Sequence, residues 1–367
     1  MNVIYLLIIL QVVVNKTAKK HIINTLSLEE KKEKVLEIPI ELSFQDSPLI
    51  NICYGHPPQC FKVKIVTNFC ESFIKAKKGN NPGFDISASH TVLNEMDKFQ
   101  FIYSVLKLQG YLLQDTILIK DINISIPNFS FYLITDGADN LQYDGVIGLG
   151  QVYFDSSLSI MNQLYVNNHI RNLIFSTKFF DKERKGILTF GYHKISHEDR
   201  YKVTDLLWNQ ESKYFEIRMN AIFLYNDKEV FTYSKVQNTL ISPGSNKNFC
   251  PKEFFDFVQK TLLRSSLKKD GICELSNEGP FKLIRCKGDI NDYNFGRIKF
   301  IFGKWNVEYE MNKLFTECDF GYLCFEIAYF EGNTRWVFGY SFIKDFHVIF
   351  DKKEMKLYLK RNNITKK

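Results

Sequence analysis

A proline-rich turn between two strand-like stretches constrains this chain more than any other feature of its sequence. Residues 51–54 are mostly apolar, and residues 61–65 alternate apolar side chains with lysines, the period-two pattern of a half-buried strand. Between them, residues 55–58 read Gly-His-Pro-Pro. Glycine permits an unusual φ and proline fixes its own, so this is turn chemistry. The stretch predicts a β-hairpin whose two-residue loop is His56-Pro57.

The register of this hairpin brings two cysteines face to face. With His56-Pro57 as the loop, Cys53 lies opposite Cys60, and directly opposed cysteines of antiparallel strands are close enough for a disulfide. The chain has eight cysteines, an even number that favours disulfides in a secreted protein. None of them has Cys-X-X-Cys spacing, so we expect no metal site.

Composition narrows the class of protein. The 367 residues are 45% hydrophobic and 15% aromatic, enough for a sizeable core in one two-lobed unit or in two domains. The net charge of +7 arises from 48 basic and 41 acidic residues that are scattered along the chain. A nucleic-acid-binding protein more often shows one basic stripe with interleaved aromatics, so we expect no nucleic-acid partner.

The N-terminus has the pattern of a targeting segment. Residues 3–14 form an apolar run that is shorter than the roughly 20 residues of a membrane span. We therefore predict a signal peptide over residues 1–18, with a buried N-terminal strand as the alternative. Residues 19–45 are charged and are expected to be a short leader. No other apolar run approaches 18 residues, so we expect no integral membrane segment in the mature chain, and a location in the secretory pathway, extracellular or lumenal.

Three further motifs follow the hairpin. Tyr103 is followed by Gly110 seven residues later and by Asp115 twelve residues later. Residues 143–150 read Tyr-Asp-Gly-Val-Ile-Gly-Leu-Gly, without the Gly-X-Gly-X-X-Gly spacing of a dinucleotide-binding loop, and we expect no cofactor. Residues 239–245 read Thr-Leu-Ile-Ser-Pro-Gly-Ser, and a helix is predicted shortly after them.

Together these motifs resemble the pepsin-like aspartic proteases. The family's Gly-X-Pro-(Pro/Ala)-Gln turn matches residues 55–59, and its Asp-Gly-Ile-(Leu/Met)-Gly-Leu-Gly matches residues 144–150. Residues 185–191 and 336–342 resemble two further strands of the family, and the whole resemblance spans roughly residues 47–361.

The resemblance implies a mostly β fold. In that fold two pseudo-symmetric, β-rich lobes enclose a central cleft. We expect the N-terminal lobe at residues 46–203, the C-terminal lobe at 204–361 and a tail at 362–367.

The resemblance also places a flap hairpin over the cleft. In the family, a tyrosine with the spacing of Tyr103, Gly110 and Asp115 marks this hairpin. The alternative for Tyr103 is a core aromatic residue. Leu106 falls at the tip, where the family prefers small residues, and so would crowd or seal the cleft.

In the same register, the two catalytic aspartates of the family fall on Val66 and Ser242. Two carboxylates sharing one proton hold the attacking water in this family. A valine carries no proton, and a serine is a negligible base at neutral pH. The resemblance therefore implies a cleft without aspartic-type hydrolysis.

The residues beside these two positions are only partly altered. Thr67 keeps the family's threonine, Asn68 replaces a glycine, and Gly244 and Ser245 match the second active-site loop. We expect all four to line the cleft.

Two kinds of covalent modification are expected from the resemblance and from short motifs. Cys286 resembles the cysteine of the family's C-terminal lobe, with Cys324 or Cys318 as its partner, and we expect Cys286–Cys324. Asn-X-Ser/Thr sequons make Asn123 and Asn128 candidates for glycosylation.

Three hypotheses for the function follow. The first is a secreted, inactive homologue that binds a peptide or protein in or near the cleft, or acts as a decoy or scaffold, and is monomeric. The second is an aspartic endopeptidase with a divergent active site. The third is a purely structural secreted protein whose cleft is closed, which Leu106 and Phe69 would favour.

Overall fold

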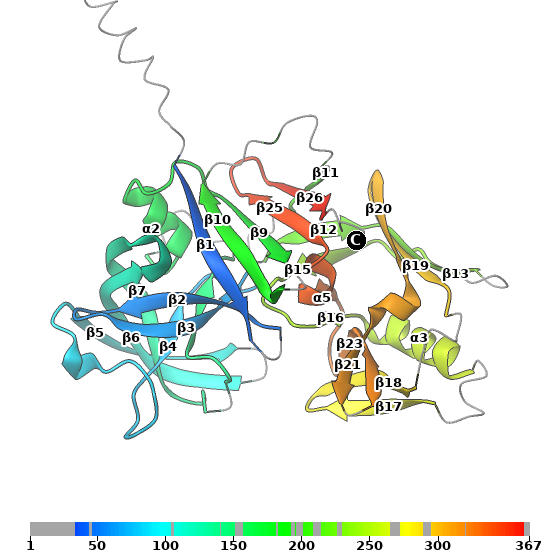
Figure 1. Ribbon diagram of the computed structural model, residues 1–367, viewed down its shortest axis with the longest axis horizontal. Helices are drawn as coiled ribbons and strands as arrows, with labels where there is room; N and C mark the ends of the chain where they lie inside the picture. Colours follow the sequence, from blue (N-terminus) through cyan, green and yellow to red (C-terminus); the bar gives the residue numbers. More distant parts are fainter. Residues whose placement is uncertain are drawn as a thin grey trace, which may run out of the picture. The chain divides into compact units, whose positions relative to one another are not determined.

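The computed structural model describes most of the chain beyond the N-terminal segment (Figure 1). The expected signal peptide and most of the expected leader lie outside the described residues. The described residues are 34–43, 46–103, 106–139, 141–150, 157–180, 183–191, 195, 201–207, 214–225, 230–264, 272–288, 295–319 and 321–362.

The described residues are mostly β-structure, as expected. Thirteen of the described strands form one sheet, in the order β11-β26-β25-β9-β10-β1-β2-β3-β8-β4-β7-β6-β5. In chain order these strands are β1 Val35–Leu42, β2 Pro48–Tyr54, β3 Gln59–Val66, β4 Phe73–Lys75, β5 Leu93–Tyr103, β6 Leu106–Ile119, β7 Ile124–Asp136, β8 Gly145–Gly148, β9 Ile174–Phe180, β10 Lys185–Gly191, β11 Lys202–Asp205, β25 Phe346–Asp351 and β26 Lys356–Arg361.

The strands between β11 and β25 form two further sheets. The second sheet contains β12 Glu216–Met219, β15 Gln237–Ile241, β16 Asn248–Phe249, β17 Cys273–Glu278, β18 Phe281–Lys287, β21 Phe315–Asp319, β22 Tyr322–Phe325, β23 Ile327–Phe330 and β24 Trp336–Phe338. The third contains β13 Ala221–Tyr225, β14 Val230–Tyr233, β19 Arg297–Phe302 and β20 Trp305–Glu310.

Helices are short and few among the described residues. The α-helices are α2 Ile160–Val166, α3 Lys252–Arg264 and α5 Tyr340–Ile343, and the 3-10 helices are η1 Ile86–Ala88, η2 Lys120–Ile122 and η6 Met311–Leu314. The helix predicted shortly after residues 239–245 is α3. Within the described part of the chain, no helix is both long and apolar enough to cross a membrane.

The hairpin predicted from the proline-rich turn is β2 and β3. Cys53 pairs with Cys60 and Tyr54 with Gln59, the predicted register. Cys53 and Cys60 form the expected disulfide, with their Cα atoms 3.8 Å apart. Gly55 has a φ of +77°, which lies in the left-handed region that favours glycine. The conformation of the turn therefore explains the glycine at this position.

The last strands of the chain return to the first sheet. β25 pairs with β9, β26 pairs with β25, and β11 pairs with β26, so these strands lie side by side with β10 and β1 (Figure 1). Pro39 of β1 pairs with Ile187 of β10, while β2 joins β1 only at Glu41 and Leu42. A proline is tolerated there because no second strand pairs with it.

The expected Cys286–Cys324 disulfide is wrong. Cys286 of β18 lies directly opposite Cys273 of β17, and these two form the disulfide. The neighbour of Cys286 on the other side is Leu323, so Cys324 is offset by one residue. Cys324 instead pairs with Cys318 of β21. Direct opposition across one strand pair decided the partner, as it did for Cys53 and Cys60.

The glycine-rich strand β8 lies between β3 and β4. A Cβ added to Gly145 would lie 2.3 Å from the Phe73 carbonyl oxygen, and one added to Gly148 would lie 2.4 Å from the backbone of Cys70. The close approach of these backbones therefore requires glycine. β8 supports the segment that follows β3, because Val66 pairs with Gly148.

Candidate functional site

Two loops from distant parts of the chain meet at the ends of β3 and β15. Thr67 Oγ1 donates a buried hydrogen bond of 2.8 Å to the carbonyl oxygen of Ile241, 174 residues away in the sequence. A Cβ added to Gly244 would lie 2.8 Å from Cγ1 of Val66. The structure thus brings together Val66, Thr67 and the Ser242–Ser245 loop.

The two loops have similar surroundings but are not equivalent. Each follows a strand with a parallel neighbour, since β3 pairs with β8 and β15 pairs with β24. Pro243 follows Ser242 as Thr67 follows Val66. A proline has neither a hydroxyl nor an N–H group. The hydrogen bond that Thr67 makes to the second loop therefore has no counterpart from Pro243.

The two residues at which these loops begin, Val66 and Ser242, carry no acid. Val66 is buried, and its carbonyl oxygen accepts a hydrogen bond of 2.7 Å from the Leu149 N–H. Ser242 is also buried, and its N–H donates to the Phe338 carbonyl at 2.8 Å. Its Oγ has no hydrogen-bond partner among the described residues. A buried hydroxyl without a hydrogen bond lowers the stability of the folded state, and Ser242 carries this hydroxyl where the two loops meet.

The other expected cleft residues are placed around this meeting point. Asn68 is exposed, while Gly244 is buried. Ser245 is half-buried, and its Oγ donates to the Lys247 carbonyl at 2.9 Å. The structure thus engages the hydroxyl of Ser245 within its own loop.

The expected flap is the hairpin of β5 and β6. Tyr103 pairs with Leu106, and residues 104 and 105 at the tip lie outside the described residues. A Cβ added to Gly110 would lie 1.8 Å from the Leu133 carbonyl oxygen, so this position requires glycine. Asp115 is buried and accepts hydrogen bonds from the hydroxyls of Ser89 and Thr91.

An apolar cluster, here called the flap cluster, joins the flap to the first loop. Tyr103 belongs to it together with Val66, so this tyrosine is both a core aromatic and a neighbour of the loop. The buried members are Val66, Phe73, Tyr103, Leu108, Ile134, Ala138 and Val146, and the partly buried members are Phe69, Phe99, Phe101, Leu106, Tyr132, Leu141 and Tyr143.

Phe69 connects the first loop to the flap within this cluster. Its ring stacks on Phe101 with centroids 5.2 Å apart and meets the Tyr103 ring edge-on at 5.9 Å. Phe73 also meets Tyr103 edge-on, at 5.1 Å. Such aromatic pairs favour one relative position of the flap and the loop.

Sequence reasoning missed one charged group in this region. Lys64 is half-buried, and its Nζ lies 5.1 Å from the centroid of the Tyr143 ring. The Tyr143 hydroxyl donates to the Tyr103 hydroxyl at 3.3 Å. Burial lowers the pKa of Lys64 to about 8 and raises the pKa of both tyrosines. The strand alternation of residues 61–65 could have revealed it, because in a strand that continues to Val66, Lys64 and Val66 fall on the same face.

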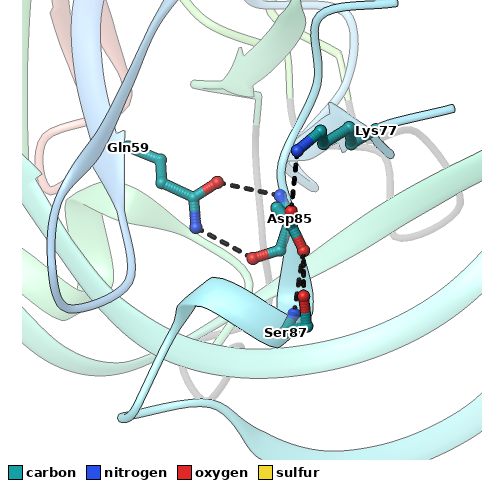
Figure 2. A network of polar contacts seen from close by, with 4 residues as sticks. All are labelled: Gln59, Lys77, Asp85 and Ser87. Carbon is teal, nitrogen blue, oxygen red and sulfur yellow. Dashed lines mark hydrogen bonds and ion pairs between the residues drawn. The ribbon is translucent and has the colours of Figure 1, made fainter. Parts of the chain in front are cut away.

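Two acidic residues that contact β3 have structural partners. The Asp144 carboxylate accepts a hydrogen bond of 2.9 Å from the Lys62 N–H, which links β8 to β3. Figure 2 shows a second network, in which Gln59 exchanges two hydrogen bonds with the backbone of Asp85 while Lys77 and Ser87 bind its carboxylate.

These contacts have electrostatic consequences but do not form a metal site. The hydrogen bond from Ser87, and then that from Lys77, lower the pKa of the Asp85 carboxyl group. No group of three or more potential metal ligands occurs among the described residues.

The comparison with known protein families identifies the class. Residues 49–361 match the family model described as eukaryotic aspartyl protease. The chain belongs to this family, and its fold is the bilobed, mostly β fold of pepsin-like proteins.

Individual relatives are distant. Plasmepsin VIII of Plasmodium berghei is 21% identical over 329 residues, which cover 85% of this chain and 86% of the relative. Pregnancy-associated glycoprotein 2 of Bos taurus is 21% identical over 355 residues, covering 90% of this chain and 86% of the relative. A probable vacuolar protease A of Trichophyton verrucosum is 27% identical over 191 residues, covering 48% of this chain and 47% of the relative.

Proposed function

We propose that this protein is a secreted, catalytically inactive member of the aspartyl protease family that binds a peptide or protein, as a decoy or as a scaffold. The observation that carries the proposal is the identity of the side chains where the two loops meet. In this proposal Val66 and Ser242 occupy the positions of the family's two catalytic aspartates.

The chemistry of these side chains supports inactivity. Valine neither binds water nor carries a proton. The Ser242 hydroxyl can donate a hydrogen bond but does not act as a general base. Acid–base help is typically worth about 10²–10⁴ in rate, and the loss of both water-holding groups adds to that deficit.

A second candidate function rests on the flap cluster. Phe69 and Leu106 pack with Tyr103 and Val66 against the first loop, and this packing favours a closed cleft. A purely structural secreted protein with such a cleft would bind no peptide there, and its protein contacts would lie elsewhere on its surface.

The first test separates an inactive protein from an enzyme with a divergent site. We would measure pepstatin binding by calorimetry at acidic and neutral pH, and cleavage of quenched peptides on the same sample, with pepsin as the positive control. The central hydroxyl of pepstatin depends on two carboxylates, so we expect neither binding nor turnover. Tight binding with pepstatin-sensitive turnover would overturn the proposal and establish an active endopeptidase.

The second test separates peptide binding from a purely structural role. Pools of synthetic peptides would be incubated with the purified full chain, and the bound fraction would be quantified by mass spectrometry. The proposal predicts enrichment of some sequences over others. Equal recovery of all sequences at background level would favour the closed, structural protein.

A further inference from the structure

The ammonium group of Lys64 is the most unusual charge near the meeting point of the loops. Within the described part of the chain it makes no hydrogen bond and no ion pair, and its one close partner is the Tyr143 ring. A cation over an aromatic face gains about 0.5–2 kcal/mol, and its three N–H donors remain available. A half-buried lysine thus keeps its charge in the flap region without a carboxylate.

The neighbouring acid does not serve as that carboxylate. Asp144 follows Tyr143 directly, but its carboxylate accepts from the Lys62 N–H. Burial lowers the pKa of Lys64 to about 8, and no neighbouring carboxylate raises it again. By contrast, Lys75 is influenced by Asp144 and Asp139, which raise its pKa against the effect of burial.

Two tyrosine hydroxyls lie in the same region as this ammonium, one of them on the ring that the ammonium faces. The hydroxyls of Tyr143 and Tyr103 are 3.3 Å apart, and both tyrosines belong to the flap cluster with Val66. Burial raises the pKa of both, so both remain neutral. Tyr143 gives its one proton to Tyr103, which orients the Tyr103 hydroxyl and leaves its own proton to donate. An ammonium group and this phenol hydroxyl together match a carboxylate, which accepts several hydrogen bonds.

We propose that the cleft of this protein recognises a carboxylate, which Lys64 binds with help from the Tyr103 hydroxyl that Tyr143 orients. The ligand class is an acidic peptide, whose carboxylate comes from a Glu or Asp side chain or from the peptide's C-terminus. This inference rests on the proposed peptide-binding function and names the chemistry of its ligand. Binding of a ligand carboxylate would also explain why a lysine occupies a position at which burial disfavours its charge.

The test compares peptide pools that differ in one charge. One pool of amidated octapeptides carries a fixed central Glu, and the matched pool carries Gln, with the other positions randomised. A third pool carries Gln and a C-terminal carboxylate. The bound fraction from each pool is measured on the wild-type full chain and on Lys64→Met, Tyr143→Phe and Lys62→Met.

The expected result is a preference of at least about tenfold for a carboxylate-bearing pool over the amidated Gln pool, as a charge-assisted hydrogen bond provides. The Glu pool or the C-terminal acid pool will show which source is used. Lys64→Met should abolish the preference, and Tyr143→Phe should reduce it while keeping the ring beneath the ammonium. Lys62→Met is the matched control, because Lys62 lies on the same strand, is exposed and pairs with Glu41. It should retain the preference.

The other outcomes each decide the matter. Equal binding of all three pools would overturn the carboxylate site and leave peptide binding intact. A preference that survives in Lys64→Met would also overturn it. No binding of any pool would overturn this inference together with the peptide-binding part of the proposed function, and would favour the closed, structural protein. If Lys64→Met does not fold, the ¹⁵N shift of the Lys64 amine in the wild type decides, because it should move on addition of the preferred pool and stay unchanged with amidated Gln peptides.

Discussion

At the scale of single residues, a half-buried charge without a carboxylate distinguishes the region of the flap. The pKa of Lys64 is about 8 in the folded chain, against an ordinary value of 10.5. Below about pH 8 the lysine is protonated in both the folded and unfolded states, and the folded state bears the full cost of burying the charge. Between about 8 and 10.5 this cost fades, because the folded lysine is already neutral and the unfolded lysine loses its proton as well.

The substitution Lys64→Met should therefore stabilise the protein at neutral pH. We expect a gain of about 1–2 kcal/mol in the free energy of unfolding. This gain is smaller than the shift in the pKa of Lys64 would give, because solvent screens a side chain that is only half-buried. The gain should shrink as pH rises from about 8 toward 10.5. Urea denaturation over this range measures it, and Lys62→Met is the exposed control. A gain that does not depend on pH would contradict the explanation.

At the scale of elements, the flap hairpin is attached to the first loop by aromatic contacts. The hairpin is at the edge of the first sheet, where β5 pairs with β6. Phe69 supplies two of its ring contacts, to Phe101 and Tyr103. Edge strands with few partners open most readily, so these contacts determine how often the flap leaves the loop.

The substitution Phe69→Ala should loosen the flap. We expect faster amide hydrogen exchange over residues 99–103, by about tenfold, because about 1–1.5 kcal/mol of ring contact is lost. Exchange in β12 and β15 should not change. Phe231→Ala removes a different stacked pair, with Phe257, and serves as the control. Unchanged exchange in residues 99–103 would show that Phe69 does not fasten the flap.

At the scale of the whole molecule, one buried hydrogen bond joins loops from the two halves of the chain. Thr67 donates to Ile241, and Pro243 offers no counterpart. The junction therefore depends on a single hydroxyl, the backbone contact of Gly244 with Val66, and the strands β25 and β26 that return to the first sheet.

The substitution Thr67→Val should destabilise the protein by about 1–3 kcal/mol, because it removes the hydroxyl at nearly constant volume and leaves a buried carbonyl without this donor. Thr177→Val is a matched control. Thr177 is equally buried, and its hydroxyl has no hydrogen-bond partner among the described residues. Its replacement should cost nothing measurable or stabilise slightly. Equal effects of the two substitutions, measured by urea denaturation, would rule out a special role for Thr67.

Local patterns in the sequence determined several elements of this protein. The alternation in residues 61–65 and the turn at Gly55 predicted the β2–β3 hairpin, and the hairpin register predicted the Cys53–Cys60 disulfide. The glycines of β8 allow the backbones of its neighbours to approach closely. These features depend on residues near one another in the chain, where period, turn chemistry and register leave few alternatives.

Contacts between distant strands were decided only by the tertiary structure. The sequence could not order β17, β18 and β22, so it could not choose Cys273 as the partner of Cys286. Nor could it place the Tyr143 ring beneath the Lys64 ammonium. Strand order depends on how apolar faces across the whole molecule are buried together, and no local pattern contains that information.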